Sequence, residues 1–302
     1  MSLRLTTVAL TAVVMLLAGG CVPTSSDADE GRLAVVSTMS VFSDFATAVG
    51  GEHVRVETLV EVGGDPHTYE PAPSDAALVT DADVVLDNGL GLSPWFEPLA
   101  GNVEGRLVTL TEDIAEGAVA SRGVLDPHMW MVPPLVAEGY VTAIEEAFTE
   151  ADPANAEDYA ANARAYRRRL GRLDDELAER FATIPPDRRR LVTSHDAYRY
   201  FANHYRIEVL GTVIGVTTEE EPSAQAVSTL IDQIRRARVP TIFVESTVNP
   251  DLIERVARDA GVAVGEPLYG DSVGEPGSGA DTYVGMMRAN AAAIVSGLGG
   301  DA

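Results

Sequence analysis

The tripeptide Asp-Pro-His occurs twice in this chain, at residues 65–67 and 126–128. Proline fixes its own backbone φ and pushes the preceding residue toward extended conformations, so each copy predicts a stiff turn that presents an imidazole. The chain has only five histidines, and imidazole is a common metal ligand and the usual acid–base group near neutral pH. A lone histidine is more often a surface or packing residue, but a repeated rigid presentation favours a metal-binding or proton-transfer site.

Length and composition limit the class of protein. At 302 residues, the chain suits two domains of ordinary size. A hydrophobic content of 46% with 23% charged residues is typical of a globular protein. The formal net charge of −24 argues against nucleic acid as a partner, because phosphate binding needs a basic face.

The N-terminus predicts secretion and lipidation. Residues 5–17 form an apolar run that is too short to cross a membrane and fits a signal peptide spanning residues 1–20. Cys21 is the only cysteine and follows small residues, which resembles a bacterial lipoprotein cleavage site; an ordinary secretory signal is the alternative. We expect residues 21–32 to be the lipidated cysteine and a polar, flexible tether. Several acyl chains would anchor the protein on the extracytoplasmic face of the cell membrane.

Short apolar runs alternate with helical patterns through the rest of the chain, which predicts an α/β fold with parallel sheets and helices on their faces. The strands are expected at residues 33–38, 54–60, 84–87, 107–110, 190–194, 207–214, 240–244 and 262–267. The helices are expected at residues 40–49, 74–80, 133–149, 197–204, 223–238, 251–260 and 281–298. Caps are expected at Ser40, at Ser74 or Asp75, and at Ser223, and Asp281-Thr282 would open the last helix.

One further predicted helix is much longer than the others. It begins at Asp152-Pro153, and its apolar residues recur three or four positions apart until Pro185 ends it. The helix would have roughly 30 residues and, at about 1.5 Å per residue, a length of about 45 Å. We therefore expect a linking helix at residues 153–184 between an N-terminal α/β lobe, 33–152, and a C-terminal α/β lobe, 185–302.

Candidate ligands from both halves follow predicted strands. His195 comes directly after a strand, whereas His67, His128 and Asp271 follow strands through loops. In open α/β sheets, ligands bind beyond the carboxyl ends of the strands. A site between the two lobes would therefore take two side chains from each half.

At this point the sequence resembles a known family, the metal-specific solute-binding lipoproteins of bacterial ABC importers for zinc and manganese. The matching stretches are GGDPHTYEPAPSD (63–75), DPHMW (126–130), LVTSHDAYRYFANHY (191–205), EEEPS (219–223), FVEST (243–247) and GDS…DTYVGMM (270–287). The resemblance implies two α/β lobes, each a mostly parallel sheet with flanking helices, joined by one long rigid helix. It also places metal ligands at His67, His128, His195 and Asp271.

The resemblance implies a binding protein, not an enzyme, that captures a divalent metal ion and delivers it to an ABC permease; we expect a monomer. Relatives that prefer manganese usually have glutamate at the third ligand position, where this chain has His195. Imidazole and a tetrahedral shell suit Zn²⁺, whereas Mn²⁺ favours more oxygen ligands and a higher coordination number. We therefore expect Zn²⁺ as the transported ion, with manganese or iron as the alternative.

Three acids near the ligands are candidates for supporting roles. Glu245 ends a strand and could lie behind the ligands or replace water on the metal. Asp65 and Asp126 are expected to cap their turns, and either could orient a histidine ring.

Two other functions stay open. A zinc hydrolase would use three histidines as ligands and Asp271 as general base, but the chain has no His-Glu-x-x-His helix. Four protein ligands would also leave no position for an activated water. A surface adhesin of the same family is the other alternative.

Overall fold

The computed structural model describes residues 31–121, 123–219 and 221–301, and residues 32–302 form one compact unit. The predicted signal peptide and Cys21 lie outside the described residues. No helix within the described ranges is long and apolar enough to cross a membrane. The boundaries between the two lobes and the linking helix stay a prediction.

The first half contains a four-stranded parallel sheet with the strand order β2-β1-β3-β4. Its strands are β1 (Leu33–Met39), β2 (Val54–Val60), β3 (Val84–Asp87) and β4 (Arg106–Thr109). The intervening helices are α1 (Ser40–Gly50), α2 (Pro73–Asp81) and α3 (Glu97–Ala100). Val35, at the centre of β1, pairs with both Val56 and Val84 and is buried. Apolar, β-branched residues suit such a doubly covered sheet.

The second half also contains parallel strands. The pairs are β7 (Arg190–Thr193) with β8 (Glu208–Thr212), and β9 (Thr241–Ile242) with β10 (Ala263–Val264). A parallel bridge between Thr193 and Phe243 joins the two pairs, and a second bridge joins Glu245 to Leu268. The helices are α7 (Arg199–Tyr205), α8 (Ala224–Ala237), α9 (Asp251–Ala260) and α10 (Tyr283–Leu298). The α/β prediction with mostly parallel sheets is therefore confirmed.

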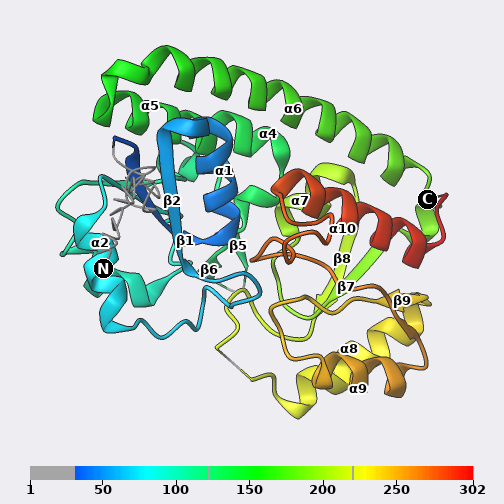
Figure 1. Ribbon diagram of the computed structural model, residues 1–302. Helices are drawn as coiled ribbons and strands as arrows, with labels where there is room; N and C mark the ends of the chain where they lie inside the picture. Colours follow the sequence, from blue (N-terminus) through cyan, green and yellow to red (C-terminus); the bar gives the residue numbers. More distant parts are fainter. Residues whose placement is uncertain (1–30, 122, 220, 302) are drawn as a thin grey trace, which may run out of the picture. The chain divides into compact units, whose positions relative to one another are not determined.

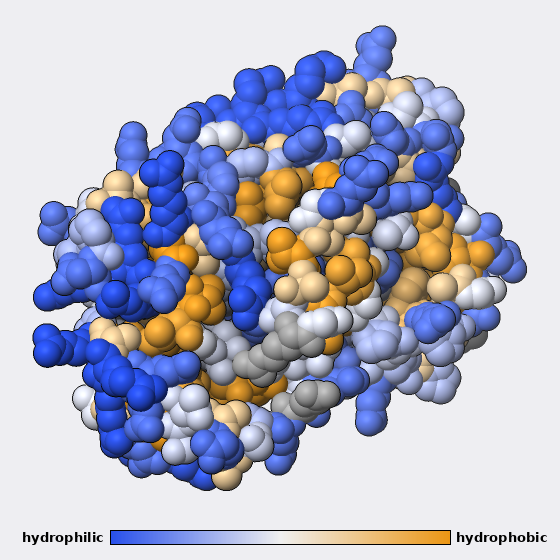
Figure 2. All heavy atoms as spheres, turned by 180° about the vertical axis from the view of Figure 1, so that it is seen from behind, coloured by the Kyte–Doolittle hydropathy of each residue, from blue (hydrophilic) through white to orange (hydrophobic). Residues whose placement is uncertain are grey.

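The long helix α6 (Ala156–Ala182) has 27 residues and follows a 3₁₀ turn at Pro153–Asn155. It packs against α1 and α5 of the first half and against α10 of the second, and so lies along both (Figure 1). The predicted stripe is buried: Tyr159, Ala163, Tyr166, Leu170, Leu173, Leu177 and Phe181. The opposite face carries exposed charges such as Arg168 and Glu179, and hydrophilic atoms cover this edge of the molecule (Figure 2).

The structure differs from the sequence prediction after Pro133. The expected single helix is divided into α4 (Pro133–Leu135), a π-helical turn (Val136–Tyr140) and α5 (Val141–Ala151). Gly139 lies in the π turn, where a Cβ would come within 2.8 Å of the Ile114 side chain. The wider turn also lets the Tyr140 hydroxyl donate to Asn88 at 2.8 Å. A π turn depends on such tertiary contacts, and no helical spacing reveals it.

Two of the predicted caps were wrong. The side chain of Ser40 does not cap α1; its Oγ instead lies 3.2 Å from the Oγ of Ser272. Helix α2 begins at Pro73, so its N-cap residue is Ala72. Asp75 is the third residue of the helix, and its carboxylate accepts the Ala72 backbone N–H at 2.7 Å. The predicted cap at Ser223 is confirmed, because its hydroxyl accepts the Ala226 N–H. Thr282, in the predicted opening of the last helix, caps α10 by accepting the N–H three residues on.

A short antiparallel hairpin precedes the second Asp-Pro-His turn and was not predicted. It consists of β5 (Ala120–Ser121) and β6 (Val124–Leu125). Two-residue strands are too short to show a periodic pattern. The remaining short elements are 3₁₀ turns at Gly51–His53, Pro94–Phe96, Glu112–Gly117, Met129–Met131 and Pro186–Arg188.

Candidate metal centre

The structure brings the four predicted ligands together: His67, His128, His195 and Asp271. One donor atom from each lies within 4.8 Å of the donor atoms of the other three. No more than 2% of any of these residues is exposed. The cluster is a buried site of three imidazoles and one carboxylate that could hold a divalent metal ion.

The parallel strands explain why these distant residues meet. His67 lies in the loop between β2 and α2, and His195 lies two residues beyond β7. His128 follows the hairpin that comes after β4, and Asp271 lies in the loop between β10 and α10. Each residue therefore lies beyond the carboxyl end of a parallel strand, where loops of α/β sheets form binding sites.

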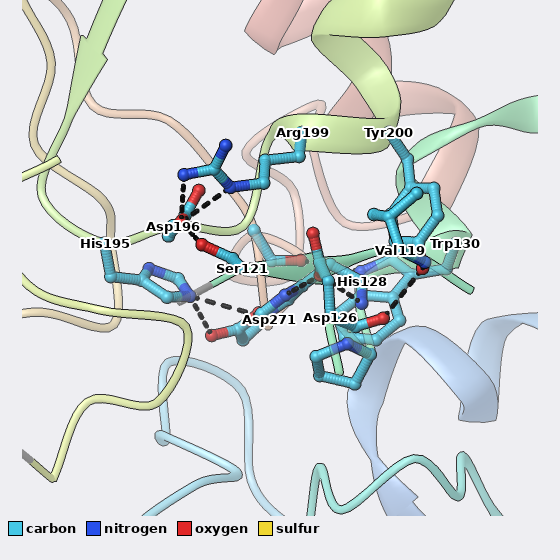
Figure 3. A network of polar contacts seen from close by, with 12 residues as sticks. Val119, Ser121, Asp126, His128, Trp130, His195, Asp196, Arg199, Tyr200 and Asp271 are labelled. Atoms are coloured by element: carbon cyan, nitrogen blue, oxygen red, sulfur yellow. Dashed lines mark hydrogen bonds and ion pairs between the residues drawn. The ribbon is translucent and has the colours of Figure 1, made fainter. Parts of the chain in front are cut away.

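The carboxylate of Asp271 lies among the three rings. Its Oδ1 is 3.4 Å from Nε2 of His128, and its Oδ2 is 3.1 Å from Nε2 of His195 and 3.6 Å from Nε2 of His67. The Nε2 atoms of His128 and His195 are 3.4 Å apart (Figure 3). A tetrahedral shell with metal bonds of about 2.0–2.1 Å has edges of about 3.3 Å. These separations therefore suit a shared metal ion.

Several donor atoms in the centre lack a hydrogen bond. Both carboxylate oxygens of Asp271 and both ring nitrogens of His67 are buried, yet none makes a well-aligned hydrogen bond with a described residue. Burying a carboxylate without compensation is costly, and buried polar groups normally find partners. A bound cation would supply the missing partner for these atoms.

Carboxylates lie next to Nδ1 of two of the histidine rings, on the side away from the other ligands. Oδ1 of Asp126 lies 2.8 Å from Nδ1 of His128 and also accepts the backbone N–H of His128 at 3.0 Å. Oε2 of Glu245 lies 2.6 Å from Nδ1 of His195, and its Oε1 accepts the backbone N–H of His195 at 2.8 Å. An acid at Nδ1 favours the tautomer whose Nε2 has a free lone pair for a metal.

The third histidine has a different environment. Asp65 accepts the backbone N–H of His67 at 2.8 Å, so it caps the turn as expected. Nδ1 of His67 has no hydrogen-bond partner among the described residues. Of the two Asp-Pro-His aspartates, Asp126 therefore contacts both the backbone and the ring of its histidine, whereas Asp65 caps the turn.

The electrostatics of the centre favour a positive charge. Burial alone would raise the pKa of Asp271, but the facing imidazoles, His195 foremost, hold that pKa well below its usual range. Burial opposes protonation of His128, yet Asp126 and Asp271 raise its pKa to about 9. Glu245 and Asp271 likewise overcome burial and raise the pKa of His195 well above its usual value. Without metal, the surrounding acids therefore favour the doubly protonated form of these two rings.

Sequence reasoning assigned no role to three residues that tie the ligand loops together. The Trp130 indole N–H donates to the Gly270 carbonyl at 3.0 Å, and Gly63 N–H donates to the Ser272 hydroxyl at 2.8 Å. The Tyr200 hydroxyl donates to the Asp126 carbonyl at 2.9 Å. All three lie inside the matched stretches, but spacing along the chain does not distinguish a side chain that joins loops from one that packs.

Comparison with known proteins identifies the family. The sequence profile of the ZnuA family, zinc-uptake complex component A, periplasmic, matches residues 35–297. The chain is 37% identical over 289 residues to the manganese-binding lipoprotein MntA of Halalkalibacterium halodurans, a match that covers 95% of this chain and 96% of the relative.

Solved structures agree in fold. The periplasmic zinc binding protein TroA from Treponema pallidum superposes with a TM-score of 0.85 at 29% identity, covering 89% of this chain and 99% of TroA. A Mn-bound mutant of the periplasmic metal binding protein from Candidatus Liberibacter asiaticus superposes with a TM-score of 0.81 at 29% identity. The match covers 88% of this chain and 100% of the other. This chain therefore belongs to the ZnuA family, the metal-binding solute-binding lipoproteins of ABC metal importers, which are transport proteins and not enzymes.

Proposed function

We propose that this protein captures a divalent transition-metal ion outside the cell and delivers it to the permease of an ABC importer. The observation that carries the proposal is the closed centre, in which three imidazoles and a carboxylate surround one point and are almost completely buried. A hydrolytic metal site keeps an open position for water. A closed shell of protein ligands instead suits capture and release.

The ion would be bound by Nε2 of each histidine and by the carboxylate of Asp271. This assignment is supported by the 3.1–3.6 Å separations between the Asp271 oxygens and the three ring nitrogens. Asp126 and Glu245 would keep the rings of His128 and His195 aimed at the metal. On this assignment Glu245 is a supporting residue and not a ligand, because its carboxylate faces Nδ1 and the backbone N–H of His195.

We propose Mn²⁺ as the cargo, which is the alternative to the zinc expectation. Neither oxygen of Asp271 has a hydrogen bond among the described residues, and each faces a ring nitrogen, so the carboxylate can bind through both. Three nitrogens and two oxygens give five ligands, and Mn²⁺ favours oxygen ligands and a high coordination number. The 37% identical relative from Halalkalibacterium halodurans is a manganese-binding lipoprotein, which also supports manganese.

Zn²⁺ is the second candidate. Three imidazoles with one carboxylate oxygen form a tetrahedral set that zinc favours. TroA, whose fold superposes on this chain, is described as a zinc binding protein.

Release would need the centre to open. We propose that lobes 33–152 and 185–302 tilt apart slightly, and that α6 limits this movement because its buried stripe packs against helices of both halves. Cys21 would carry the acyl chains that keep the protein at the extracytoplasmic face of the membrane, beside its permease.

Metal uptake by cells tests the proposal. Most sites bind Zn²⁺ more tightly than Mn²⁺, so affinity alone does not identify the cargo. A strain that lacks this protein should accumulate less manganese, and the wild-type protein should restore uptake whereas Asp271→Ala should not. The exposed Glu275 lies in the same loop, so Glu275→Ala is the matched control and should restore uptake fully. A loss of zinc accumulation alone would select the second candidate, and unchanged uptake of both metals would refute the proposal.

A further inference from the structure

The loops that carry His128 and His195 are joined by hydrogen bonds in which no metal ligand takes part. Resting on the proposed function, we infer that Tyr200 is a positioning residue that couples these two loops and slows the release of the metal ion. Figure 3 shows Tyr200 beside Asp126, with Asp196 and Arg199 at the other end of the same network.

The hydroxyl of Tyr200 makes two hydrogen bonds to the segment that leads into His128. It donates to the carbonyl of Asp126 at 2.9 Å and accepts the backbone N–H of Val119 at 3.0 Å. The side chain is in the first turn of α7, and Tyr200 is only 7% exposed. Because the carboxylate of Asp126 holds the ring of His128, Tyr200 acts on that ring through one intermediate residue.

A second contact holds the same segment from the residue next to His195. The carboxylate of Asp196 is completely buried and accepts hydrogen bonds at 2.7 Å from the Ser121 hydroxyl and from Nε of Arg199. The Asp196 backbone N–H donates to the carbonyl of Gly215 at 3.0 Å, which fixes Asp196 to its own half. Tyr200 therefore holds Val119 and Asp126, and Asp196 holds Ser121 between them in the sequence.

These contacts bear on metal release. The Nε2 atoms of His128 and His195 must lie close together to share a metal ion, and they are 3.4 Å apart in this structure. Opening of the centre would separate the two loops and break the bonds of Tyr200. An interaction that exists only in the closed state raises the population of that state. A buried hydrogen bond contributes roughly enough to change an equilibrium about fivefold to tenfold. Loss of the hydroxyl should therefore speed release by a comparable factor.

The test measures the rate at which the Mn²⁺-loaded full-length protein gives up its metal to an excess of a fluorescent chelator in a stopped-flow instrument. Tyr200→Phe keeps the ring and removes both hydrogen bonds. The matched control is Tyr205→Phe in the same helix: Tyr205 is 6% exposed, and its hydroxyl donates to Asp174 of α6 at 2.8 Å. We expect release about fivefold to tenfold faster for Tyr200→Phe and within about twofold of wild type for Tyr205→Phe.

Ser121→Ala provides a second variant, because it removes the donor to Asp196 without touching Tyr200, and we expect it to speed release as well. Unchanged release from Tyr200→Phe with one bound metal would overturn the inference and leave the proposed function intact. Equal acceleration by Tyr205→Phe would also overturn it, because the effect would then be general loosening. A wild-type protein that binds no metal would instead overturn the proposed function and this inference with it.

Discussion

Nδ1 of His195 and Oε2 of Glu245 lie 2.6 Å apart, and both side chains are fully buried. The acid thus faces the ring nitrogen that points away from the centre, while Nε2 lies 3.1 Å from Asp271. Glu245 is fixed in turn, because its Oε1 also accepts the Ser194 hydroxyl at 3.0 Å. An acid this close to Nδ1 favours a proton on that nitrogen, which leaves Nε2 available to a metal.

Glu245→Gln should lower metal affinity about 10- to 100-fold, as expected when the partner behind a ligating histidine is lost. An amide NH₂ that faces Nδ1 would favour the tautomer with a proton on Nε2, which then cannot bind metal. Equilibrium competition with a chelator of known affinity measures the change. Glu254→Gln, at an exposed position in α9, is the control and should bind like wild type. Equal affinities of Glu245→Gln and wild type would show that Glu245 does not orient the ring.

Metal binding should release about two protons per ion at pH 7. The pKa of His128 is raised to about 9 and that of His195 is raised well above its usual value, which favours a second proton on each ring in the metal-free protein. Each ring must lose this second proton before its Nε2 can bind a metal ion. Calorimetric titration in buffers of different ionisation enthalpy counts the released protons.

The direction in which metal affinity changes with pH follows from this release of protons. The metal-free state holds more protons, so affinity should fall with falling pH, already below about pH 9, by about tenfold per pH unit for each proton released. Affinity that stays constant between pH 8 and pH 6 would contradict protonation of these rings.

Gly270→Ala should weaken metal binding about tenfold, because a Cβ at this position would lie 3.0 Å from Oε2 of Glu245 and 3.7 Å from Cε1 of His195. The acid would have to move, and small displacements of a ligand shell are costly. Gly171→Ala in α6 is the control, since its added methyl group meets no described residue within 4 Å outside its own stretch of helix. It should stabilise the protein by about 0.5–1 kcal/mol through helix propensity and leave affinity unchanged. Thermal unfolding and chelator competition on both variants separate the two effects.

The parallel sheets, the long helix and the convergence of four distant residues were all predictable from the sequence. They depend on patterns that local chemistry enforces, namely apolar runs, a continuous helical stripe and residues placed just beyond strands. The π turn at Gly139, the hairpin before Asp126 and the links made by Tyr200 and Ser272 were not predictable. The π turn and the two links depend on contacts between segments far apart in the chain, and no local spacing encodes them. The hairpin is a local structure, but its two-residue strands are too short to show a periodic pattern.

Arg288 of α10 forms an ion pair with Glu176 of α6 through two nitrogens. Its Nε and Nη2 lie 3.0 Å and 2.8 Å from Oε2 of Glu176. The hydrogen bond from Arg288 is the main reason that the pKa of Glu176 is lowered. A lowered folded-state pKa contributes stability above the unfolded-state value and loses it as pH falls through the folded-state value.

Glu176→Gln should therefore lower the free energy of unfolding of the metal-free protein at pH 7, by less than about 1 kcal/mol because the pair is partly exposed. The difference from wild type should vanish only well below the ordinary glutamate pKa of about 4.3, once the carboxyl group is protonated in the folded state as well. Urea unfolding at both pH values measures it, with the exposed Glu179→Gln as control. A difference that persists in acid would assign the loss to packing and not to charge.

The most direct test of the metal centre is anomalous X-ray scattering from a crystal of the protein soaked in Mn²⁺ and measured at the manganese absorption edge. The account predicts one dominant peak within about 2.0–2.3 Å of Nε2 of His67, His128 and His195 and of the carboxylate of Asp271. A dominant peak elsewhere, or an empty centre in a crystal that holds manganese at other sites, would contradict it.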